Sequence, residues 1–91
     1  MGNSNRFWKD PNAILDYGIP WLDWLGTDTI STSTWIVPSG ITKVTDSKTN
    51  TTTTIWLSGG TVSQEYALTN RIVTNGGRTQ DQTIYVTIEE R

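Results

Sequence analysis

The sequence predicts an all-β fold in which two sheets pack against each other. Seventeen of the 91 residues are threonine, and β-branched residues suit the pleated, half-buried surface of a strand better than a helix. From residue 29 onward, short stretches of alternating apolar and polar residues are separated by turn residues, a pattern typical of a sandwich or a small barrel. Roughly six strands, with no amphipathic helix to cover them, favour two packed sheets.

The composition limits what stabilises the chain and what it binds. A chain of this length builds one thin core, and it has no cysteine for disulfides, so strand pairing and the five tryptophans are expected to supply much of the stability. Seven basic and nine acidic residues give a formal net charge of -2, without a run of like charge, so we expect no binding to nucleic acid or to a membrane. No apolar stretch is of membrane-spanning length and the opening residues do not resemble a secretory signal, which predicts synthesis in the cytoplasm.

The first part of the chain is predicted to differ from the rest. Residues 1–13 are expected to form an extended N-terminal arm, and residues 14–91 the sandwich domain. Residues 14–19 alternate apolar and polar side chains and predict a first strand, at a sheet edge, that Pro20 ends. The aromatic stretch at residues 21–25 predicts a turn or a single helical turn before the next glycine.

Five further strands are predicted between clusters of turn residues. They cover residues 29–37, 41–45, 51–57, 64–74 and 83–89. Proline, glycine or polar residues predict turns at 38–40, 46–50 and 58–60. Asn75-Gly76 predicts a hairpin into the last strand through a type I′ turn, because that turn needs two residues with positive φ.

Alternation along the strands predicts the core. The expected core residues are Trp21, Trp35, Tyr66, Leu68, Ile72, Ile84, Val86 and Ile88. Trp56 is expected on the opposite face from Ile55 and Leu57, covering a sheet edge. Tyr66 follows a glycine turn at the start of the penultimate strand, which is where immunoglobulin-like domains carry their tyrosine corner. The sequence therefore predicts an immunoglobulin-like β-sandwich of about six to seven strands, in which the Tyr66 hydroxyl bonds the backbone near residues 60–62; a small barrel is the alternative.

Two residue types that often carry catalysis are missing. The chain has no histidine and no cysteine, which removes the most common acid–base residue, the familiar nucleophile–base triads and the soft metal ligands. Its carboxylates show neither the pairing of a catalytic site nor the spacing of a calcium loop. The two glycine pairs do not lie between a strand and a helix, as a phosphate-binding loop requires. We therefore expect no enzymatic activity, no cofactor and no bound metal.

Aromatic side chains are the candidate binding residues. Tryptophan is enriched in interface hot spots as well as in cores. Phe7, Trp8 and Trp24 are hard to bury in so thin a sandwich, and Trp56 is expected at a sheet edge. These four side chains are the interface candidates. Exposed tryptophans also stack on sugar rings, so carbohydrate binding remains an alternative.

A series of short motifs follows in order along the chain from Lys9. They are Lys9-Asp10-Pro11, Leu15-Asp16-Tyr17, Asp28-Thr29-Ile30, Ser33-Thr34-Trp35-Ile36-Val37, Thr54-Ile55-Trp56-Leu57-Ser58-Gly59-Gly60, Tyr66-Ala67-Leu68-Thr69-Asn70-Arg71-Ile72, Gly76-Gly77-Arg78-Thr79 and Ile84-Tyr85-Val86. In their order and coverage they resemble a family of small phage proteins, the fibre-tail adaptors of contractile-tailed cyanophage and related phages.

The resemblance implies a non-enzymatic virion component of the tail or baseplate, in which an immunoglobulin-like domain connects the baseplate to the receptor-binding fibre. The implied partners are other tail, baseplate and fibre proteins, with several copies per particle, assembled after synthesis in the host cytoplasm. The sequence departs from the family pattern in the aromatic residues 21–24 and the threonine-rich residues 48–54. Two other functions share these features: a carbohydrate- or cell-surface-binding module, and a phage head decoration protein.

Overall fold

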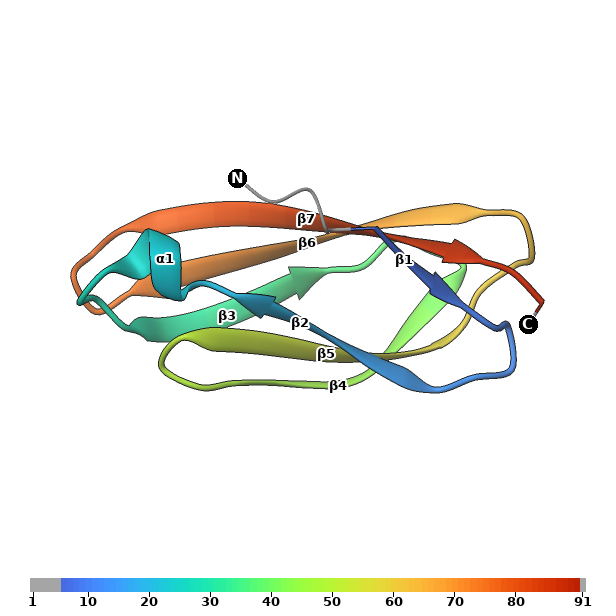
Figure 1. Cartoon of the computed structure of the whole chain (residues 1–91), viewed down its shortest axis with the longest axis horizontal. Coiled ribbons are helices and arrows are strands. Elements are labelled where there is room, and N and C mark those ends of the chain that lie inside the picture. The colour runs from blue at the N-terminus through green and yellow to red at the C-terminus, as the bar shows by residue number, and fades with distance from the viewer. Residues whose placement is uncertain (1–5, 91) are drawn as a thin grey trace.

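The structure, a computed structural model, describes residues 6–90, which form seven strands and one helical turn (Figure 1). The elements are β1 (Arg6–Lys9), β2 (Leu15–Pro20), α1 (Leu22–Leu25), β3 (Ile30–Ile36), β4 (Ile41–Lys48), β5 (Thr52–Gly59), β6 (Glu65–Thr74) and β7 (Thr79–Ile88). In the described part of the chain, no helix is long and apolar enough to span a membrane.

The strands form two sheets that pack face to face. One sheet has four strands in the order β1-β7-β6-β3, and the other has three in the order β2-β5-β4. β1 runs parallel to β7, and every other neighbouring pair is antiparallel. The predicted all-β sandwich is confirmed, with seven strands. β2 lies at a sheet edge and ends at Pro20, as predicted.

The sequence did not predict β1. Residues 6–9 belong to the expected arm, yet they pair with β7 in register from Arg6 opposite Tyr85 to Lys9 opposite Ile88. The described beginning of this segment is therefore an edge strand of the four-stranded sheet. Its alternation is hard to recognise because a cation, Lys9, faces inward and a tryptophan, Trp8, faces outward.

Several predicted bounds differ from the structure. β5 continues through Ser58 and Gly59, where the sequence predicts a turn, and β7 begins at Thr79 and not at residue 83. β4 continues to Lys48, so the turn predicted at residues 46–50 begins too early and lies between Lys48 and Thr52. Polar side chains suit this strand because it lies at a sheet edge.

The β6–β7 hairpin is confirmed, but its type I′ turn is wrong. Gly77, not Asn75 or Gly76, has positive φ, and the Gly77 N–H donates to Thr74 O at 3.0 Å, which describes a type I turn followed by a left-handed glycine.

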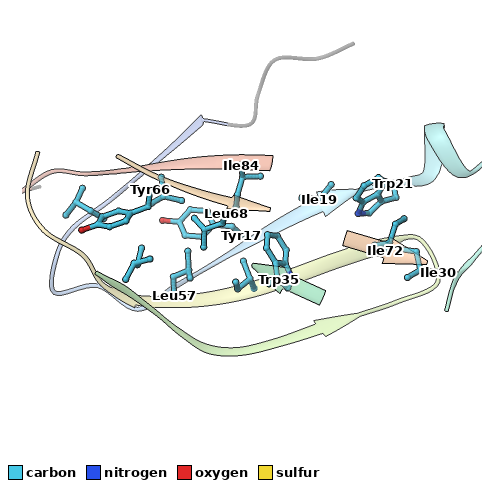
Figure 2. Close-up of a cluster of buried hydrophobic side chains, with 14 of the residues drawn as sticks. Tyr17, Ile19, Trp21, Ile30, Trp35, Leu57, Tyr66, Leu68, Ile72 and Ile84 are labelled. Atoms are coloured by element: carbon cyan, nitrogen blue, oxygen red, sulfur yellow. The ribbon is translucent and has the colours of Figure 1, made fainter. Parts of the chain in front are cut away.

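The core lies between the sheets, and both contribute to it (Figure 2). All eight residues predicted to be core are buried. Tyr17, Ile19, Ile55 and Leu57 join them from the three-stranded sheet. The Thr61 N–H donates to the Tyr66 hydroxyl at 3.0 Å, which confirms the predicted bond between this side chain and the backbone just upstream.

A buried polar network at Asn70 connects the two sheets. Asn70 Oδ1 accepts hydrogen bonds from Trp21 Nε1 at 3.1 Å and from Thr53 Oγ1 at 2.6 Å. Its Nδ2 donates to Ser33 Oγ at 2.9 Å and to Thr34 O at 3.1 Å. Asparagine has two donors and two acceptor sites, so its burial leaves no polar group unsatisfied.

Candidate functional site

Phe7 faces inward and attaches β1 to the sandwich. Its ring centroid lies 5.1 Å from that of Tyr17 on β2, and the side chain is half-buried against the core. The Tyr17 hydroxyl donates to Trp8 O at 3.2 Å, and burial, followed by the charge of Asp16, raises the pKa of this phenol. Phe7 thus packs within the molecule.

Lys9, which the sequence analysis did not single out, is completely buried next to Phe7. Its Nζ donates to Asp10 O at 2.9 Å and to Gly59 O, at the end of β5, at 2.7 Å. Desolvation lowers the pKa of the ammonium, while Asp10 opposes the shift. This side chain links the edge of the four-stranded sheet to the three-stranded sheet. In a strand, residues two positions apart face the same side, so the spacing of Lys9 from Phe7 is the signal for an inward position. Because lysine is usually exposed, its residue type hides this position in the sequence.

Trp8 projects from the outer face of the four-stranded sheet and is 50% exposed. It lies opposite Thr87 of β7. Two residues away on the same face, the Arg6 guanidinium lies 4.9 Å from the centroid of the Tyr85 ring and 2.7 Å from a Glu65 carboxylate oxygen. Trp8 therefore extends a surface on which Arg6 contacts the Tyr85 ring and is paired with Glu65.

Trp24, on α1, is held by neighbouring side chains. Its ring packs edge-on against Trp21 with centroids 5.7 Å apart, and the Arg78 guanidinium lies 4.3 Å from its centroid. Arg78 Nη2 also donates to Leu25 O at 2.9 Å. Trp24 is half-buried in this arrangement and serves to close one end of the sandwich.

Asp28 completes this end of the molecule by contacting the β6–β7 hairpin. Its carboxylate accepts the backbone N–H groups of Thr29 at 2.8 Å and Gly76 at 3.0 Å, and Arg78 Nε at 3.2 Å. Hydrogen bonds, from the Thr74 side chain above all and then from these groups, lower the pKa of Asp28 to about 2, against the opposing effect of burial. The charges of Asp28 and Arg78 are therefore part of the fold.

Trp56 lies on the outer face of the three-stranded sheet and is 39% exposed. Its two neighbours are buried, as predicted, but the strand that carries it is central, so its predicted place at a sheet edge is wrong. In register across the sheet, Asp16 of β2 and Thr45 of β4 flank it. The adjacent rows add Thr54 with Ser47, and Ser58 with another threonine. The indole is therefore surrounded on this face by hydroxyl side chains and by the Asp16 carboxylate.

The four interface candidates therefore do not form one site. Phe7 and Trp24 pack within the molecule, whereas Trp8 and Trp56 project from opposite outer faces of the sandwich. Within residues 6–90, no group of three or more acidic, histidine or cysteine side chains is placed to hold a metal ion. Each outer face of the sandwich therefore carries one of the two exposed tryptophans.

Comparison with known proteins identifies a family that this chain matches. A family model described as podophage GP4 fiber-tail adaptor protein gp77 matches residues 9–87, which include six of the seven strands nearly or completely. A search of curated proteins returns no match. The match confirms the fibre-tail adaptor resemblance, although its description names podophage where the resemblance pointed to contractile-tailed cyanophage.

Proposed function

Because the chain belongs to the podophage fibre-tail adaptor family, we propose that it is a non-enzymatic virion protein that binds one neighbouring protein on each outer face of its sandwich. Trp8 is the anchor on the four-stranded sheet, and Trp56 is the anchor on the three-stranded sheet. One partner belongs to the fibre and the other to the tail or baseplate. The observation that carries the proposal is the placement of two exposed tryptophans on opposite faces of one rigid domain.

Two properties of the faces support protein partners. On the outer face around Trp8, Arg6 is already paired with Glu65, so docking a partner there does not bury that guanidinium as an isolated charge. Large aromatic side chains at the centre of a patch are the usual anchors of protein interfaces. Rigid attachment of β1 through Phe7 and Lys9 keeps Trp8 in place before binding.

An immunoglobulin-like classification of the sandwich belongs to the same proposal. The strand order β2-β5-β4 in one sheet and β3-β6-β7 in the other corresponds to the B-E-D and C-F-G order of such domains. Tyr66 makes the tyrosine-corner bond at the expected strand. These two observations support a compact, rigid spacer between two partners.

The test separates the two faces by substitution. Trp8→Ala and Trp56→Ala are each expected to weaken binding to one partner by about tenfold or more, because a buried anchor is lost, while binding to the other partner is unchanged. Leu22→Ala, which removes an exposed apolar side chain from α1, is the matched control. The measurement is co-purification with the fibre and tail proteins of the same phage, followed by incorporation into particles. Full retention of both partners by both tryptophan variants would contradict the proposal.

The surroundings of Trp56 support a second candidate, binding of a carbohydrate. Asp16 and Thr45 flank the indole, and further hydroxyls lie in the adjacent rows, so a sugar ring could stack on the indole while its hydroxyls bond these side chains. Titration with host polysaccharide is then expected to change tryptophan fluorescence in the wild type and in Trp8→Ala, and to give no change in Trp56→Ala. An unchanged wild-type spectrum, with no hit on a glycan array, removes this candidate.

A further inference from the structure

The four edge strands of the sandwich are not equally protected against pairing with another strand. Exposed edges are usually blocked by charge, proline, bulges or short length. β1 has four residues, and β2 contains a glycine and ends at Pro20. β4 carries Lys43 and Lys48 and has an irregular register between Lys43 and Thr45. Each of these three edges therefore has at least one protective feature.

β3 differs from the other three edges. Its seven residues, Ile30–Ile36, include no charged residue, no proline and no glycine. In the described part of the chain it pairs with β6 alone. Its register is irregular only between Ile30 and Thr32, and from Thr32 to Ile36 the pairing is continuous. This second half of β3 is a regular and uncharged strand edge.

The side chains along this edge are also exposed and neutral. Thr32 and Thr34 are exposed, and Ile36 is 49% exposed. The nearest charge across the ladder, Arg71 opposite Thr34, is held in a two-pronged ion pair with Asp81 at 2.8 and 2.9 Å. At the other end of the strand, Lys48 Nζ donates to Ile30 O at 3.2 Å, so the charged side chain covers the beginning of β3 and leaves residues 32–36 accessible.

We propose that β3 pairs in antiparallel orientation with β3 of a second copy of this chain, so that two four-stranded sheets form one continuous sheet. The argument is self-complementarity. Pairing about a two-fold axis at Thr34 places Thr32 opposite Ile36 and Ser33 opposite Trp35, and no charge faces a like charge. Threonine and β-branched pairs favour such cross-strand contacts, and a two-fold axis gives each copy the same contacts.

The pairing leaves both tryptophan faces accessible, because an edge-to-edge contact lies beside the sheets and not on them. The dimer would present two copies of each outer face. A partner with repeated binding sites would therefore bind the dimer with higher overall affinity than a single copy. The proposal does not depend on the identity of the partners.

The experiment measures the oligomeric state of the full chain by light scattering and sedimentation over a wide range of concentration. The wild type is expected to dimerise as concentration rises. Thr34→Lys is expected to remain monomeric, because two like charges would meet at the axis. Ser47→Lys, which adds the same charge to the β4 edge, is the matched control and is expected to dimerise like the wild type.

A charge-swap experiment distinguishes loss of pairing from loss of folding. Thr34→Glu alone is expected to be monomeric, and an equimolar mixture of Thr34→Glu with Thr34→Lys is expected to restore a dimer, with unchanged β-sheet circular dichroism throughout. A wild type that stays monomeric at every concentration overturns the proposal. It is also overturned if Ser47→Lys disrupts the dimer as strongly as Thr34→Lys, or if β3 pairs only with a strand of another protein.

Discussion

At the scale of single residues, the two most buried tryptophans differ in whether their indole N–H groups are hydrogen-bonded. Trp21 Nε1 lies within hydrogen-bond distance of Thr53 Oγ1 and Asn70 Oδ1, each at 3.1 Å. Trp35 Nε1 is buried without a hydrogen-bond partner among the described residues. A buried donor without a partner destabilises the folded state. The indole N–H of Trp21 therefore stabilises the fold through its hydrogen bonds, whereas that of Trp35 destabilises it.

Substitution by phenylalanine should expose this difference. Trp21→Phe and Trp35→Phe both reduce side-chain volume, but Trp21→Phe also removes the indole donor of a buried network. Thr53 Oγ1 loses the hydrogen bond it accepts, and Asn70 Oδ1 keeps only the one from Thr53. We expect Trp21→Phe to lose about 1–3 kcal/mol more unfolding free energy than Trp35→Phe. Denaturant unfolding measured by circular dichroism gives both values.

The pairwise design controls for the cavity that each substitution leaves, because the residue types exchanged are the same. Asn70→Ala provides a further check on the network. It should reduce the difference between the two phenylalanine variants, since one of the two acceptors of the Trp21 indole is gone and Thr53 Oγ1 remains. Equal losses for Trp21→Phe and Trp35→Phe would show that packing alone decides their stability.

At the scale of elements, Asp28 connects the segment between α1 and β3 to the β6–β7 hairpin. It accepts the Gly76 N–H and Arg78 Nε from the hairpin, and Arg78 in turn covers Trp24. In Figure 1 the hairpin and α1 lie at the same end of the molecule. The loop and the hairpin are thus ordered together.

The depressed pKa of Asp28 predicts an acid-dependent loss of stability. Its folded value of about 2 lies below the ordinary value of 3.8, so the carboxylate stabilises the fold fully above about pH 4 and loses this effect as pH falls towards 2. Asp28→Asn should therefore lower the melting temperature at neutral pH and flatten its decline between pH 4 and pH 2.

Thermal unfolding followed by circular dichroism at a series of pH values tests this expectation. Asp23→Asn is the control, since Asp23 is an exposed carboxylate on nearby α1. The control should keep the wild-type pH profile. A profile of Asp28→Asn that matches the wild type between pH 4 and pH 2 would assign the acid response to other carboxylates.

At the scale of the whole molecule, different polar interactions hold the two ends of the sandwich together. At one end Lys9 joins the edge of the four-stranded sheet to Gly59 of the other sheet. At the opposite end Asp28 and Arg78 hold the hairpin against α1. Between them lies an apolar core with the Asn70 network inside it. A domain of this construction holds its two outer faces in a constant relation, which suits an adaptor between two proteins.

Much of this architecture could be predicted from local patterns. Alternation located six strands and every core residue that was named, and Asn75-Gly76 located the last hairpin. The prediction failed where local chemistry was ambiguous. β4 continues through polar residues because an edge strand needs few apolar contacts, and Gly77 takes the left-handed conformation because it follows a type I turn.

The candidate site was less predictable than the fold. Phe7, Trp8 and Trp24 are predicted as hard to bury and Trp56 as covering a sheet edge, but burial depends on which strand lies opposite each of them. The pairing of β1 with β7 turns Phe7 inward and Trp8 outward, and Arg78, which is 54 residues further along, covers Trp24. No local pattern contains these contacts.

The sequence by itself determined that this chain forms β-strands, where most of them lie and which faces are apolar, because period-two alternation and turn residues are properties of neighbouring positions. Only the tertiary structure decided that residues 6–9 complete a sheet, that Lys9 and Asn70 are buried with partners, and that Trp8 and Trp56 occupy opposite faces. These features depend on residues far apart in the chain, whose pairing follows from the packing of two sheets around one core.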